Sequence, residues 1–374
     1  MEHLAQDADA VREAISRARH GLVERELIAE VVALCAVAGE HLLVIGPPGT
    51  AKSEAVRRVA QQLGGEYFEY LLGRFTEPNE IFGPVDLRRL RDGVVEVETA
   101  GMLPEADIAF LDEVFLGSTA ILNTLLGVLN ERVFRRGSTL KKCPLRVCVG
   151  AANLLPEDHT LAAFADRFLA RLFVEAVPDA RLEELLESGR ARREPAGTTS
   201  LLGALDRLSQ QAGQCGLDAA RPLLGKAIRR LRSAGMVITD RRAVRVQNLV
   251  AAAATLDGRA IADDRDLWVL PLIAPTADMQ ALAQEALTDL LGSSGNASLV
   301  HSAAELSKGP GARAARLAQA GDEILGRLGT PDLSFDDRLR VEATLREIDA
   351  GFAAEGLPEA LREVRTRLMV AIGA

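Results

Sequence analysis

Short apolar runs alternate with amphipathic segments from the N-terminus to about Pro178. The spacing of apolar positions predicts buried strands in the first kind of segment and helices in the second. Strands that alternate with helices are typical of an α/β fold with a parallel sheet. The expected strands are residues 42–45, 66–72, 108–111, 145–151 and 172–177, and the expected helices are residues 11–18, 24–38, 53–62, 118–131 and 161–170.

Two segments interrupt this alternation and predict hairpins outside the sheet. Residues 87–90 and 94–97 flank an Arg-Asp-Gly turn, and an Asp-Gly pair suits the positive φ values of a tight hairpin. A second hairpin is centred on Gly137 and is strongly basic. Its cations favour a solvated face, and the alternative is a pore lining that handles an acidic substrate. They are Arg132, Arg135, Arg136, Lys141 and Lys142.

The pattern changes to helices after Asp179, with almost no further strand signal. Gly, Arg, Pro and Thr cluster in residues 188–200 and indicate a domain boundary there. Helices are expected at residues 201–215, 219–234, 240–256 and 263–270, and the alanine-rich remainder indicates helical hairpins. We therefore expect an αβα core at residues 1–187, an all-α lid domain at 188–275 and a C-terminal helical extension at 276–374.

Composition restricts the class of partner. The chain has 374 residues, 48% of them hydrophobic and 26% charged, and its net charge is −9. This acidic balance disfavours a constitutive grip on nucleic acid or on an anionic membrane. Four cysteines without a C-x-x-C pair indicate neither a zinc site nor a disulfide framework, and favour the cytoplasm. We expect no export signal or membrane span.

The sequence GPPGTAKS, residues 46–53, joins the first strand to the following helix and predicts a phosphate-binding loop. Backbone N–H groups and the helix dipole would hold a triphosphate, Lys52 would reach its β- and γ-phosphates, and Ser53 would ligate Mg²⁺. The alternative is an ordinary strand-to-helix turn with a surface lysine. The candidate ATP-binding residues here are Gly46, Pro47, Pro48, Gly49, Thr50, Ala51, Lys52 and Ser53.

Ala51 departs from the generic loop motif, which has glycine at this position. A positive φ would cost alanine roughly 1 kcal/mol. We therefore expect a helical φ at Ala51.

An acidic pair follows the third expected strand. Asp112 would bind Mg²⁺, and Glu113 would polarise the attacking water. Asn153, which follows the next sheet strand, can orient that water or contact the γ-phosphate. The alternatives are ordinary loop charges and an Asx-turn.

Four arginines are candidates for contact with phosphate. Arg167, and Arg171 one turn later, could stabilise transition-state charge from one subunit in the site of the next. Their alternative is a solvated or salt-bridged side chain. Arg241 and Arg242 follow the expected cap Asp240 at the start of a helix, where cations oppose the helix dipole. Because stability alone would favour acidic residues there, their placement suggests a functional role.

Together these motifs resemble the AAA+ ATPases of the MoxR family, and within it the RavA-like branch. The resemblance spans residues 21–256 and is carried by GPPGTAKS, EYLLGRFTEPNEIFGP, FLDEVFLGSTAILNTLLGVLNERVFRRG, GAANLLPED, FADRF and TDRRA. It implies that Lys52 and Ser53 are Walker A, and that Asp112 and Glu113 are Walker B. It further implies that Asn153 is sensor 1, Arg167 the arginine finger, and Arg241 sensor 2 with Arg242 as its alternative.

The resemblance also implies a hexameric ring that hydrolyses ATP with Mg²⁺ to remodel or assemble other proteins, with a von Willebrand factor A domain protein as partner. ATP would lie between the αβα core and the lid domain, with Arg167 supplied by a neighbour and both hairpins facing the pore. Three alternatives stay open: a GTPase, disfavoured because no N-K-x-D motif is present, a nucleic-acid motor, and a nucleotide-gated scaffold with little turnover.

Overall fold

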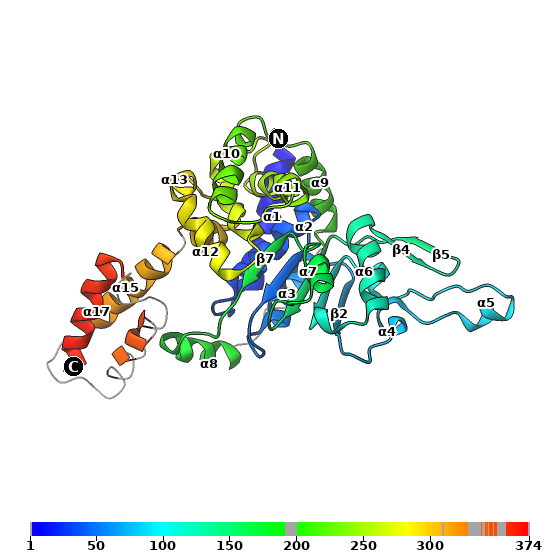
Figure 1. The fold of residues 1–374 in the computed structure, drawn as a ribbon, viewed down its shortest axis with the longest axis horizontal. Helices are drawn as coiled ribbons and strands as arrows, with labels where there is room; N and C mark the ends of the chain where they lie inside the picture. Colours follow the sequence, from blue (N-terminus) through cyan, green and yellow to red (C-terminus); the bar gives the residue numbers. More distant parts are fainter. Residues whose placement is uncertain are drawn as a thin grey trace.

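A parallel sheet of five strands forms the centre of the molecule (Figure 1). We analysed a computed structural model, which describes residues 2–190, 200–308, 310–327 and 357–372, with scattered positions between 338 and 349. The strand order is β2-β3-β6-β1-β7, and all four pairings are parallel, which confirms the predicted α/β class. The strands are β1 (Leu42–Ile45), β2 (Tyr67–Leu71), β3 (Ile108–Asp112), β6 (Val147–Ala152) and β7 (Ala170–Phe173).

Alternate residues of the strands enter two separate hydrophobic cores. Leu42 and Val44 pack with one set of helices, whereas Leu43 and Ile45 face the other. This is the period of two that a strand imposes on its side chains. The first face carries α1 (Glu2–Arg19), α2 (Glu26–Ala38) and α3 (Lys52–Leu63), and the second carries α6 (Thr119–Glu131) and α7 (His159–Ala165).

The helices of the expected lid domain pack on α1 and α2 and share their core. Helix α11 occupies the predicted residues, but Thr239, not Asp240, is its N-cap, because the Thr239 hydroxyl accepts the Arg242 N–H. The lid elements are α9 (Leu202–Gly213), α10 (Ala220–Ser233), α11 (Asp240–Leu256) and the 3₁₀ helix η4 (Asp264–Ile273). The expected boundary at residues 188–200 lies largely outside the described residues, and α8 (Leu182–Arg190) precedes it.

The C-terminal helices belong to two hydrophobic clusters. The main core includes buried residues of α12 (Ala277–Ala286), α13 (Thr288–Leu291) and α14 (Val300–Lys308). A separate core is shared by α15 (Pro310–Arg327) and α17 (Glu359–Ile372). The expected boundary at residue 276 therefore does not coincide with a break in the hydrophobic core. No helix within the described ranges combines the length and apolarity needed to cross a bilayer.

Two arms leave the sheet on the same side of the molecule (Figure 1). The basic arm is the predicted hairpin, with β4 (Val133–Arg136) and β5 (Thr139–Lys142) antiparallel. In the other arm Val85 and Val97 form an antiparallel bridge, but the predicted strand at residues 87–90 is wrong, because the Asp86 carboxylate caps the short helix α5 (Leu87–Arg91) there. The Ser138 N–H and hydroxyl both donate to Val95 O, so the two arms are hydrogen-bonded together.

Helix α7 ends and β7 begins earlier than the sequence predicts. The helix stops at Ala165, and Ala170 already pairs with Leu42, where residues 161–170 were expected to be helical. The cause is tertiary, because the Ala170 N–H donates to His41 O at the start of β1. Arg167 therefore lies in the connection between α7 and β7, and Arg171 lies inside the sheet.

A buried carboxylate attaches α14 to the core. Glu30 on α2 is 0% exposed, accepts the backbone N–H groups of His301 and Ser302, and pairs with Arg19. An acidic group at a helix N-terminus satisfies donors that have no partner within the helix.

We expect Glu30→Ala to lower the free energy of unfolding by about 3 kcal/mol, because it leaves two N–H groups and one guanidinium without their acceptor. Urea unfolding of the full chain measures this loss. The control is Glu13→Ala on α1, whose carboxylate pairs with Arg17 and is 77% exposed. Equal unfolding curves for Glu30→Ala and the control would show that this cap contributes nothing.

Candidate active site

The phosphate loop connects β1 to α3, as predicted, and encloses the lysine side chain. Lys52 Nζ donates to Gly46 O at 2.8 Å and to Pro47 O at 3.0 Å, and the residue is 7% exposed. Burial lowers the pKa of Lys52, and the charges of Asp112 and Glu113 oppose that shift. The ammonium therefore lies inside the loop on two carbonyl groups, which it can exchange for phosphate oxygens.

The expectation of a helical φ at Ala51 was wrong. Ala51 has φ 56° and ψ 28°, and with Gly49 at φ 77° it turns the chain from the end of β1 into α3. A left-handed conformation costs an alanine about 1–2 kcal/mol. The loop therefore holds strain that a glycine at position 51 would not carry.

Gly46 is required for a different reason, the space around it. A Cβ atom added there would lie 2.2 Å from Val174 O, which belongs to the segment after β7. Only glycine permits this close approach, so the start of the loop packs directly against the backbone of Val174.

The acidic pair and the asparagine meet at the carboxyl edge of the sheet. β6 lies between β3 and β1, so the ends of these three strands are neighbours. Asn153 Nδ2 donates to Glu113 Oε1 at 2.6 Å, and Asp112 Oδ1 accepts the Glu113 N–H at 3.0 Å. The structure therefore brings Asp112, Glu113 and Asn153 together beside Lys52, at the edge where α/β folds bind ligands.

The available donors fit magnesium. Ser53 and Asp112 offer oxygen atoms, and among the described residues no group of three or more His, Cys, Asp or Glu side chains could hold a metal by itself. Mg²⁺ is commonly held by one or two protein oxygens, with phosphate and water supplying the rest. Such a set fits an ion that arrives with a nucleotide.

Arg167 and Arg241 lie at the opposite, amino edge of the sheet. Arg167 precedes Ala170, which pairs with the first residue of β1, whereas the phosphate loop follows the last. β1 alone separates the two edges by roughly 10 Å. Burial lowers the pKa of Arg167, and the nearby charge of Arg241 lowers it further. Neither arginine forms an ion pair with a residue that the structure describes, and the buried Nε of Arg167 has no acceptor.

The other two predicted arginines are structural in this conformation. Arg171 donates to Pro275 O at 2.6 Å and to Ala165 O from within β7, so it is no free alternative to Arg167. Arg242 is 3% exposed and donates to Phe168 O and Leu169 O. Its Nε lies 3.3 Å from Asp166, so Arg242 is not available to a nucleotide and leaves Arg241 as the exposed member of the pair.

A cavity of about 590 Å³ adjoins the phosphate loop, and the sequence did not predict its other walls. They are residues 21–23 with Arg25, residues 176–177, and one side of α8. The lining reaches Ser188 and Gly189 but includes no residue of the lid helices α9, α10 or α11. Arg25 could have been suspected, since a cation at the N-cap of α2 opposes the helix dipole.

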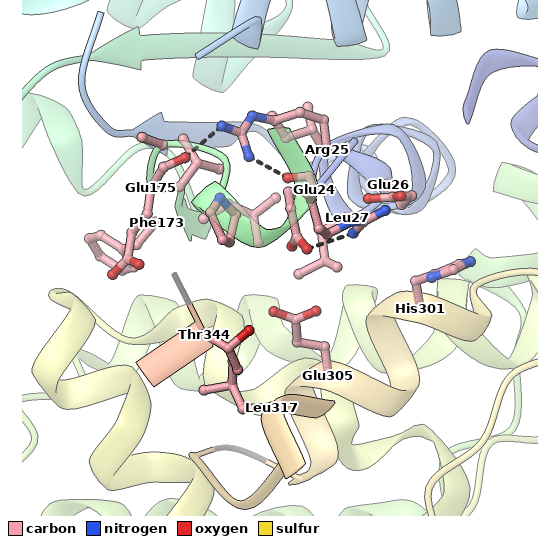
Figure 2. Close-up of a pocket in the computed structure, with 16 residues that line it drawn as sticks. Glu24, Arg25, Glu26, Leu27, Phe173, Glu175, His301, Glu305, Leu317 and Thr344 are labelled. Atoms are coloured by element: carbon pink, nitrogen blue, oxygen red, sulfur yellow. Dashed lines mark hydrogen bonds and ion pairs between the residues drawn. The ribbon is translucent and has the colours of Figure 1, made fainter. Parts of the chain in front are cut away.

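A second cavity of about 530 Å³ lies between the core and the C-terminal helices (Figure 2). Arg25 borders both cavities. The second cavity is lined by both signs of charge, with Glu24, Glu26 and Glu305 beside Arg25 and Arg181.

Comparison with known proteins identifies the family. A family model described as the MoxR domain in MoxR-vWA-beta-propeller ternary systems matches residues 9–210, more than half of the chain. The chain belongs to the MoxR family of AAA+ ATPases. Within this MoxR chain the match covers the phosphate loop, Asp112, Glu113, Asn153 and Arg167, but ends before Arg241.

The chain is also similar to curated relatives and to a solved structure. The MoxR chain is 36% identical over 251 residues to the uncharacterized protein MJ0812 of Methanocaldococcus jannaschii, covering 66% of each chain. It is 34% identical over 272 residues to MJ0079 of the same organism, covering 72% of this chain and 70% of the relative. The crystal structure of a candidate ATPase from Cytophaga hutchinsonii superimposes with a TM-score of 0.62 at 15% identity, over 79% of this chain and 97% of that one, which shows the shared fold.

The two arginines at the start of α11 give a test of their different surroundings. We expect Arg242→Met to lower the free energy of unfolding by about 2–4 kcal/mol, because it leaves Asp166 and two buried carbonyl groups without their donor. Arg241→Met should leave stability unchanged or slightly raised, since it removes a like charge near Arg167. Thermal and urea unfolding compare the two variants. Equal losses of stability would contradict the structural role assigned to Arg242.

Proposed function

We propose that this MoxR chain is a Mg²⁺-dependent ATPase whose active sites form between subunits of a ring. The observation that carries this proposal is the separation of the site residues between two edges of one sheet. Lys52, Asp112, Glu113 and Asn153 gather at the carboxyl edge, whereas Arg167 lies at the amino edge. A subunit cannot bring both sets to one nucleotide, but a head-to-tail neighbour can.

Each residue has a chemical role in this proposal. The cavity beside the loop has room for a nucleoside, backbone N–H groups and Lys52 would bind the phosphates, and Ser53 and Asp112 would hold Mg²⁺. When bound, the ion neutralises phosphate charge. Glu113 would polarise the attacking water, and its bond to Asn153 supports a role for that amide in orienting the carboxylate or the water. Arg167 would stabilise the charge that develops on the γ-phosphate.

Arg241 would act with Arg167 on the neighbour's nucleotide. The proximity of the two cations at the amino edge supports this arrangement, because their mutual repulsion is relieved by a shared anion. The family resemblance implies that Arg241 is sensor 2. A shared role in trans fits the geometry better.

The wider assembly follows from the family. We propose a hexamer in the cytoplasm that remodels or matures protein complexes, with the two hydrogen-bonded arms facing the pore. A von Willebrand factor A domain protein is the proposed partner, since the matching family model is described from MoxR-vWA-beta-propeller systems. The RavA-like branch stays a prediction from the motifs. The alignments reach about two thirds of the two Methanocaldococcus jannaschii relatives, so activity and partners of the whole protein are proposed.

Two variants separate nucleotide binding from turnover. Lys52→Ala should abolish ATP binding, because it removes the loop's ammonium, and Glu113→Gln should bind ATP without hydrolysing it. Isothermal titration and phosphate release measure the two steps. Steady hydrolysis by the Glu113→Gln protein would contradict the role assigned to that carboxylate.

Mixing two inactive variants tests whether the site is shared. Glu113→Gln subunits keep their arginines, and Arg167→Ala subunits keep their acidic pair, so a mixed ring contains some complete sites. Random 1:1 mixing should restore about a quarter of the wild-type rate of phosphate release if every interface acts independently. Two Arg167 variants, such as Arg167→Ala and Arg167→Gln, form the control pair and should restore nothing. Absence of recovery in a mixed oligomer would argue against a finger supplied in trans.

A further inference from the structure

One buried guanidinium forms hydrogen bonds with the phosphate loop and with two chain segments beside it. Arg25 is 4% exposed, and its Nε donates to Thr50 O in the loop at 2.6 Å. Its other nitrogens donate to Glu175 O at 2.5 Å and to Glu24 O. Figure 2 shows the guanidinium between the chain segments of Glu24 and Glu175. Arg25 therefore connects the N-terminal segment, the loop and the segment after β7.

The Thr50 contact bears directly on the strained residue of the loop. In a trans peptide the C=O and the following N–H point in opposite directions, and the chain contains no cis peptide among its described residues. Arg25 draws the Thr50 carbonyl toward itself, so the Ala51 N–H is directed away from Arg25. This peptide plane and the next one, which the hydrogen bond from the Ala55 N–H to Ala51 O holds in the first turn of α3, together set the left-handed conformation of Ala51.

We propose that Arg25 is the positioning residue of the phosphate loop, which holds Ala51 in its left-handed conformation and thereby directs the Ala51 N–H to the nucleotide's phosphate. This inference rests on the proposed nucleotide binding and adds a residue that the motifs do not contain. It explains how the loop functions with alanine where the generic motif has glycine. A glycine adopts the conformation unaided, whereas alanine needs an external contact.

The side-chain chemistry favours arginine at this position. A guanidinium presents five donors in a planar fork and can serve three carbonyl groups from three segments at once. A lysine would keep the charge but offers a compact ammonium on a more flexible stem. Glu24, whose carbonyl also binds Arg25, is itself left-handed at φ 56°. The same fork thus contacts the carbonyl of one strained residue and the peptide that precedes another.

The test is a double-mutant cycle between positions 25 and 51, measured as the Kd for ADP with Mg²⁺, because ADP is not consumed. Arg25→Lys should raise the Kd about tenfold, the effect of losing one charge-assisted hydrogen bond. In the Ala51→Gly background the same change should raise it less than about threefold, because glycine reaches the left-handed conformation without help. With ATP, KM should follow the Kd while kcat changes little.

A matched control and a second variant complete the test. Arg181→Gln removes an arginine that pairs with Glu24 at 2.6 Å and lines the second cavity without contacting the loop, so ADP affinity should not change. Ala51→Val disfavours the left-handed conformation without altering Arg25, and should weaken ADP binding more than about tenfold. This variant keeps the test available if Arg25→Lys does not fold.

The outcomes separate this inference from the proposed function. Recovery by Ala51→Gly supports the positioning role, since a general folding defect would not be repaired by a more flexible residue. Wild-type affinity in Arg25→Lys, or an equal loss in both backgrounds, would overturn the role while leaving nucleotide binding intact. If the wild-type protein bound no ADP, the proposed function itself would fail.

Discussion

The polarity of a parallel sheet is the constraint on which the rest of this structure depends. Because all five strands run in one direction, their carboxyl ends form one edge and their amino ends the other. β1 carries the phosphate loop at its end, and its first residue pairs with Ala170, three positions after Arg167. The same short strand thus joins the nucleotide edge to the arginine edge and keeps them apart.

Strain is concentrated around the nucleotide edge. Ala51 and Glu113, in the proposed site, are left-handed without being glycine, and so is Glu24, which precedes Arg25; the fourth such residue, Arg132, ends α6. Such conformations persist where surrounding contacts hold them and are common in functional sites. The guanidinium of Arg25 and the Asn153 amide supply two of these contacts.

The sequence predicted what depends on local pattern. β1, the loop, Asp112, Glu113 and Asn153 lie where the motifs placed them, because an apolar strand followed by glycine or acid is a local signal. The start of β7 was wrong because pairing with β1, over a hundred residues away, sets it. The distant carbonyl acceptors of Arg171 and Arg242 could not be read from local pattern for the same reason, and Arg25 was missed because its acceptors come from residues 24, 50 and 175.

The two arginines at the amino edge leave positive charge without an ion-pair partner among the described residues of the subunit. The charge of Arg241 lowers the pKa of Arg167, and neither side chain forms an ion pair with a carboxylate among the described residues. In the proposed ring, the phosphates bound by the neighbour would be their counter-ion. Nucleotide occupancy and subunit cohesion would then be thermodynamically linked, and by reciprocity each would strengthen the other. Loss of the γ-phosphate would weaken one interface of the ring, so the first structural effect of hydrolysis would occur between subunits.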